Sequence, residues 1–82
     1  MSDGTVTPEP LSALSIGQRA RIVSFTLEAG QRQRLLEMGV TTGIEVQIVR
    51  FAPLGDPIEI KVRGSHLSLR KNEAAGILVA RA

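Results

Sequence analysis

The sequence predicts a mainly β domain, a small barrel of five short strands with one short α-helix inserted. Apolar and polar residues alternate in several short runs, most regularly in Ile58–Arg63, as they do in strands with one buried face. One run differs, because Leu35 and Met38 are three residues apart, as on one helix face, and Gly39 follows them. A closed barrel is expected because closure removes exposed strand edges.

The composition indicates one globular domain. The 82 residues are 43% hydrophobic, which is normal for a folded domain and too high for a disordered chain. There is no cysteine, so disulfides and thiolate metal sites are excluded. No apolar run approaches the roughly 20 residues of a membrane-spanning helix, and the N-terminus lacks the regions of a secretory signal. We therefore expect a soluble, cytoplasmic protein.

The chain divides into an arm and one domain. Residues 1–10 carry two prolines, a glycine and three Ser or Thr residues, so we expect a disordered N-terminal arm. Residues 11–82 are expected to form the barrel domain, with Leu11 and Leu14 closing one end of its core. A break in alternation near Ser24 indicates a β-bulge. The expected strands are 19–25, 44–51, 58–63, 66–70 and 77–80.

The folded part is mildly basic. It holds all 10 Lys and Arg residues but only six of the 8 acidic residues, because Asp3 and Glu9 lie in the arm, and its formal net charge is +4. An acidic protein partner and an anionic membrane surface both fit this charge. Nucleic-acid binders usually cluster their charge more strongly.

Three glycines are predicted to make structural turns. Gly39 is placed for the left-handed residue that ends a helix, and a β-branched replacement there should cost about 1–2 kcal/mol. Gly43 is expected to open the next strand. Gly64 is expected to form a two-residue hairpin turn with Ser65.

No arrangement of residues in the sequence is typical of an enzyme or a metal site. His66 is the only histidine, and its nearest carboxylates in sequence are each seven residues away. A metal site needs three or four ligands with supporting contacts. There is no Ser/His/Asp set and no phosphate-binding glycine loop. We expect no enzymatic activity, no metal site and no cofactor.

The inserted helix, expected from Glu28 or Gly30 to Met38, offers the best candidate for a binding surface. Its two leucines at positions 35 and 36 are adjacent and point about 100° apart, so both cannot lie on one narrow buried stripe. The alternative is an ordinary solvated polar face. We predict a protein-contact surface on this helix, in which Leu36 and Arg32 touch the partner. The residues of this surface are Arg32, Arg34, Leu35, Leu36 and Met38.

The order and spacing of several motifs resemble the ferrous iron transport protein A (FeoA) family over about residues 11 to 80. One departure is Thr42, where that family often has proline before the glycine. The matching segments are LSIGQRARI at 14–22, RLLEMGV at 34–40, GIEV at 43–46, PLGDPI at 53–58, GSHLSLR at 64–70 and EAAGILV at 73–79.

The resemblance implies an SH3-like β-barrel. It also implies a small cytoplasmic accessory protein that regulates the membrane ferrous iron permease FeoB by direct contact. FeoB has a cytosolic GTP-binding domain, and binding to this partner would place the protein at the inner face of the membrane. The same fold occurs at the C-terminus of iron-dependent repressors, so a stand-alone regulatory module of that kind is an alternative.

Three further interpretations are open from the residues themselves. A small basic barrel could bind nucleic acid, but two phenylalanines offer little for base stacking. We therefore expect no nucleic-acid partner. The absence of Trp and Tyr argues against a groove for proline-rich peptides. An unpaired strand edge would allow a homo-oligomer.

Overall fold

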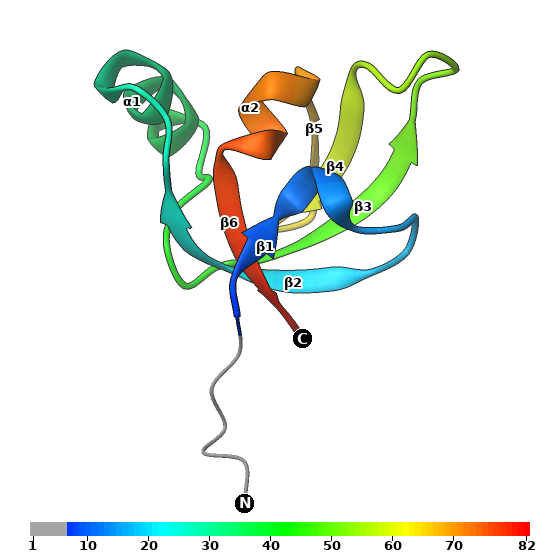
Figure 1. Cartoon of the computed structure of the whole chain (residues 1–82), viewed down its shortest axis with the longest axis horizontal. Helices are drawn as coiled ribbons and strands as arrows, with labels where there is room; N and C mark the ends of the chain where they lie inside the picture. The colour runs from blue at the N-terminus through cyan, green and yellow to red at the C-terminus, as the bar shows by residue number, and fades with distance from the viewer. Residues whose placement is uncertain (1–6) are drawn as a thin grey trace, which may run out of the picture.

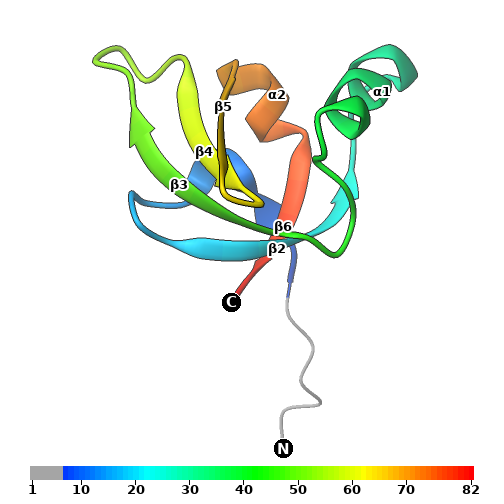
Figure 2. The same cartoon turned by 180° about the vertical axis from the view of Figure 1, so that it is seen from behind.

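The structure, a computed structural model, describes residues 7–82, in which an antiparallel sheet of six strands curls around one apolar core (Figures 1 and 2). The strand order is β1–β6–β2–β3–β4–β5. The mainly β barrel with an inserted helix is confirmed, with six strands in place of five. The elements are β1 (Glu9–Pro10), the 3-10 helix η1 (Leu11–Ala13), β2 (Arg19–Phe25), α1 (Ala29–Glu37), β3 (Glu45–Phe51), β4 (Ile58–Val62), β5 (Ser65–Leu69), α2 (Lys71–Ala75) and β6 (Ile77–Arg81).

The additional strand, β1, lies in the segment for which the sequence predicted disorder. Glu9 and Pro10 pair with β6, and the Glu9 carboxylate accepts two hydrogen bonds from the Arg81 guanidinium, at 2.7 and 3.1 Å. The prediction of a disordered arm is therefore wrong for these two residues, because their partners lie at the far end of the chain. For residues 1–6 the prediction lies outside the described residues.

The core is formed by apolar side chains that alternate along the strands, as the sequence pattern predicts. Ile58, Ile60 and Val62 of β4 all point inward and are at most 3% exposed. Leu11 is the first residue of η1 and Leu14 is its C-cap; both are at most 3% exposed and close one end of the barrel as expected. Burying one such side chain stabilises the fold by about 1.5–3 kcal/mol, so this core holds the barrel.

Several local irregularities follow the sequence prediction. The register of β2 against β6 shifts just before Ser24, which is the expected bulge. Gly39 directly follows the C-cap of α1 with φ +92°, and Gly43 precedes β3 with φ +89°. Both conformations lie in the left-handed region that glycine adopts most readily, so the two predicted turns are confirmed.

The β4–β5 hairpin turn is one residue earlier than predicted. Arg63 and Gly64 form it, with φ of +53° and +81°, and Ser65 already belongs to β5. Two successive positive φ values are typical of a type I′ turn, which favours Asn-Gly. A left-handed arginine costs about 1–2 kcal/mol. The alternation of Ile58–Arg63 hid the turn, because it continues through the arginine.

Candidate partner-binding surfaces

Helix α1 stands at one end of the barrel, and the β3–β4 loop stands at the other, with α2 between them (Figures 1 and 2). Leu35 is the buried residue of α1 and is 0% exposed. The N-cap residue, Glu28, makes no side-chain capping bond. A helix of 9 residues is marginal in isolation, so α1 depends on docking through Leu35.

An ion pair between α1 and α2 is the second attachment. The Arg34 guanidinium contacts Oε2 of Glu73, whose side chain is 5% exposed. The other carboxylate oxygen accepts the backbone N–H of Arg70 at 3.0 Å. Arg34 is the only partner of Oε2 within the described part of the chain. A carboxylate buried this deeply is stable only when it is paired, so Arg34 has a structural role.

The accessible part of α1 is smaller than the sequence predicted. Arg32 is exposed, Leu36 is half-buried, and Met38 is 41% exposed. Arg32 and Leu36 are four residues apart and share one side of the helix. The two adjacent leucines diverge as predicted, but Leu35 points into the core, and Arg34 is paired with Glu73 although its side chain is 57% exposed. The predicted contact residues that are accessible and not held by an ion pair are therefore Arg32, Leu36 and Met38.

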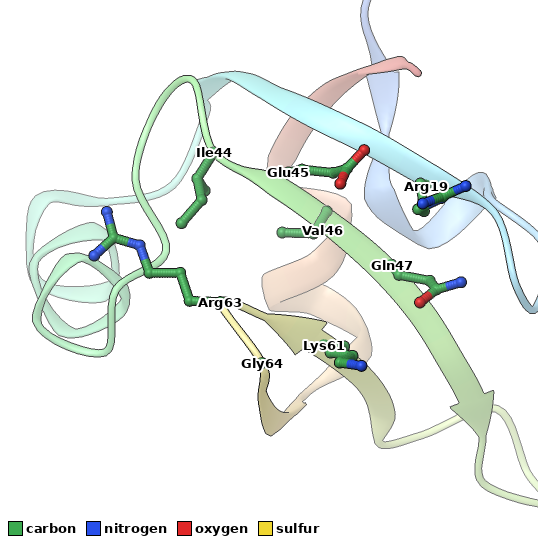
Figure 3. A pocket seen from close by; sticks show the side chains of 8 residues that line it. All are labelled: Arg19, Ile44, Glu45, Val46, Gln47, Lys61, Arg63 and Gly64. Carbon is green, nitrogen blue, oxygen red and sulfur yellow. The ribbon is translucent and has the colours of Figure 1, made fainter.

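The outer face of the sheet carries a second surface, shown in Figure 3. Arg19 of β2 pairs with Gln47 of β3, which pairs with Lys61 of β4, so these side chains lie in one row across three strands. With Arg63 and Glu45 they line a shallow depression of about 370 Å³. We call Arg19, Lys61 and Arg63 the basic wall. The sequence shows these cations but not the register that brings them together.

Other chemical groups are dispersed. Within residues 7–82, no three His, Cys, Asp or Glu residues come together in a metal-binding arrangement. His66 is exposed on β5 opposite Lys61. None of the helices described is long and apolar enough to cross a membrane. The features that the geometry does offer are the α1 surface and the basic wall.

The fold and these surfaces define a small SH3-like β-barrel domain with an inserted helix. The chain is similar to FeoA from Stenotrophomonas maltophilia, solved with zinc and described as a procaryotic SH3 domain protein. The two are 32% identical over 85% of this chain and 87% of that one, with a TM-score of 0.74. A manganese-dependent transcriptional repressor matches with a TM-score of 0.87 over 39% of its chain, but at 14% identity it shows the fold alone.

The family model of the FeoA domain matches residues 9–81, and the chain therefore belongs to the FeoA family of ferrous iron transport. FeoA from Chlorobium tepidum is 44% identical, with a TM-score of 0.84 over 88% of this chain and 69% of that one. A fusion of Fe(2+) transport protein A with the Fe(2+) transporter FeoB, from Porphyromonas gingivalis (strain ATCC BAA-308 / W83), is 39% identical over 69 residues. That match covers 84% of this chain but 8% of the fusion protein. The resemblance noted in the sequence is confirmed.

Proposed function

We propose that the chain is a non-enzymatic accessory protein of ferrous iron uptake, which regulates a FeoB-type permease by contacting its cytosolic GTP-binding domain. The observation that supports this proposal is the fusion of a related domain to a Fe(2+) transporter in one polypeptide. A covalent link raises the effective concentration of one part at the other. A separate chain needs a binding surface to reach the same proximity.

The surface that we assign to this contact is the accessible part of α1. Leu36 and Met38 supply partly exposed apolar atoms, and Arg32 adds a cation with no ion-pair partner within residues 7–82. Methionine and arginine are enriched at protein interfaces, where apolar anchors next to charged groups supply most of the affinity. The matching partner surface is an apolar patch with an acidic group beside it.

The test is calorimetric binding of the chain to the cytosolic GTP-binding domain of the FeoB-type permease from the same organism, with GTP analogue and with GDP. Leu36→Ala and Arg32→Glu should each weaken binding about fivefold or more, the effect of a 1 kcal/mol contact. The matched controls are Ile16→Ala, an apolar residue 62% exposed between η1 and β2, and Lys71→Glu. Equal affinity of all four variants would contradict the proposal.

A further inference from the structure

The basic wall carries positive charge that the sheet does not neutralise. No ion pair to Arg19, Lys61 or Arg63 exists among the described residues. Glu45 lines the same depression and makes no ion pair among the described residues, because Arg21, which lies opposite it in the β2–β3 register, donates a hydrogen bond to the Gly43 carbonyl at 2.7 Å. The lining of the depression therefore holds three cations without ion-pair partners and one carboxylate, and it keeps an excess of positive charge.

The surface around the basic wall has no apolar anchor. Of the residues that line its depression, Val46 is 1% exposed, Ile44 is half-buried, and the others are polar or glycine. Protein interfaces usually have an apolar or aromatic centre, and α1 provides such groups while the wall does not. Single-stranded nucleic acid needs aromatic stacking, whereas Phe25 and Phe51 pack against the core. A shallow cationic surface of this kind fits lipid phosphates.

The spacing of the wall also suits phosphate groups. Arg19 and Lys61 are two strand positions apart, about 10 Å between their backbones, with the uncharged Gln47 between them (Figure 3). Two long flexible side chains at that separation can reach the same or neighbouring headgroups. Arg63 occupies a left-handed turn position that asparagine or glycine would fill with less strain. A residue that breaks a local rule and adds a cation to the lining of the same depression is a candidate for a functional role.

We propose that the basic wall binds the phosphate headgroups of anionic phospholipids, so that the barrel lies on the membrane surface. In the cell this would be the membrane of the permease, and that part of the inference rests on the proposed function. The lipid binding itself does not, because α1 contributes no residue to the depression. Each Lys or Arg at an anionic membrane raises affinity about fivefold, so the wall would support a weak, reversible contact.

The experiment is sedimentation of the full chain with vesicles of phosphatidylcholine alone and with 40% phosphatidylglycerol, without permease. The wall variant is Lys61→Gln with Arg63→Asn, and the control is Arg70→Gln with Lys71→Gln on exposed positions of another surface. Each pair lowers the formal net charge from +2 to 0. Because Arg63→Asn suits the turn better, the wall variant should melt no lower than the parent chain, which separates binding from folding.

The proposal predicts that the chain binds only the vesicles that contain phosphatidylglycerol, and that salt weakens this binding. The affinity should fall about thirtyfold in the wall variant and less than threefold in the control. Equal losses in both variants would show a net-charge effect and overturn the proposal. No vesicle binding, or wall-dependent binding to polyglutamate or an oligonucleotide instead, would also overturn it. None of these outcomes affects the α1 contact, which the permease-binding experiment measures separately.

Discussion

The two α-helices of the barrel differ in how firmly they are attached, and the shorter one is held better. Helix α2 has 5 residues, of which Glu73 and Ala74 are buried, and it packs between η1 and β6. Helix α1 has 9 residues, of which Leu35 alone is buried. Length therefore does not decide which helix belongs to the scaffold.

This difference indicates which helix is available to bind a partner protein. Elements with few buried contacts open locally at a smaller free energy than the core. Helix α1 depends on Leu35 and on the Arg34–Glu73 pair, while Arg32 is exposed without an ion-pair partner among the described residues and Leu36 is only half-buried. Helix α2 supplies the buried carboxylate and so acts as part of the support. The proposed permease contact therefore lies on α1, the helix that contributes fewer buried residues to the barrel.

The largest effect is expected from the anchor of α1. Leu35→Ala should lower the free energy of unfolding by about 2–5 kcal/mol, because it opens a cavity under a fully buried side chain. Leu36→Ala removes the same atoms from the half-buried neighbour and should cost less than about 1.5 kcal/mol. Urea unfolding of both variants measures the difference. Equal losses would mean that the two leucines do not divide the helix into a docked and a free side.

The second effect concerns the two arginines of α1. Arg34→Gln leaves the Glu73 carboxylate buried without its charged partner and should cost about 1–3 kcal/mol. Arg32→Gln removes an exposed cation and should change stability by less than about 0.5 kcal/mol. Thermal unfolding checks both, and adding Glu73→Gln to Arg34→Gln should restore part of the loss. If the two single variants melt alike, the ion pair does not hold α1.

Alanine substitutions at two glycines, one in each helix region, should change stability in opposite directions. A Cβ on Gly76, directly after α2, would lie 2.2 Å from Cδ2 and 2.7 Å from Cγ of Leu27, so Gly76→Ala should cost about 1–3 kcal/mol through overpacking. Gly30 in α1 has open space around it, so Gly30→Ala should stabilise by up to about 1 kcal/mol. Denaturant midpoints with unchanged slopes would report both effects. A stabilising Gly76→Ala would show that Leu27 repacks without cost.

The sequence predicted those features that depend on neighbouring residues. The alternation of Ile58–Arg63 and the stop at Gly39 are local patterns; the helix ends where the glycine predicts, and the strand matches its pattern except for the last residue, because β4 ends at Val62. The divergence of Leu35 and Leu36 follows from helix geometry alone, so it too was predictable. The position of Arg63 was not, because alternation carries no signal about the sign of φ.

The remaining features depend on contacts between distant segments. Nothing near Arg34 shows that Glu73 will lie beside it, and nothing near Glu9 shows that Arg81 will pair with it. The basic wall exists only through the register of three strands, which the barrel as a whole sets. One missed feature did leave a signal, since a glutamate three residues after a helix N-cap, as in Arg70 to Glu73, is the spacing of a capping box.

The smallest effect concerns the Glu9–Arg81 ion pair, which is more exposed than the Arg34–Glu73 pair. Hydrogen bonding from Arg81 lowers the pKa of Glu9 below its usual 4.5, with its charge acting in the same direction. A lowered pKa in the folded state means that the pair stabilises β1 above about pH 4.5 and loses this contribution as pH falls through the folded pKa. The amide-exchange protection factors of the β1–β6 pairing, which correct for the slower intrinsic exchange in acid, should therefore fall on acidification while those of the β3–β4 amides remain high, and Arg81→Gln should remove this dependence. A uniform fall in protection across the sheet would instead show that acid acts on the whole barrel and that the terminal pair does not hold β1 by itself.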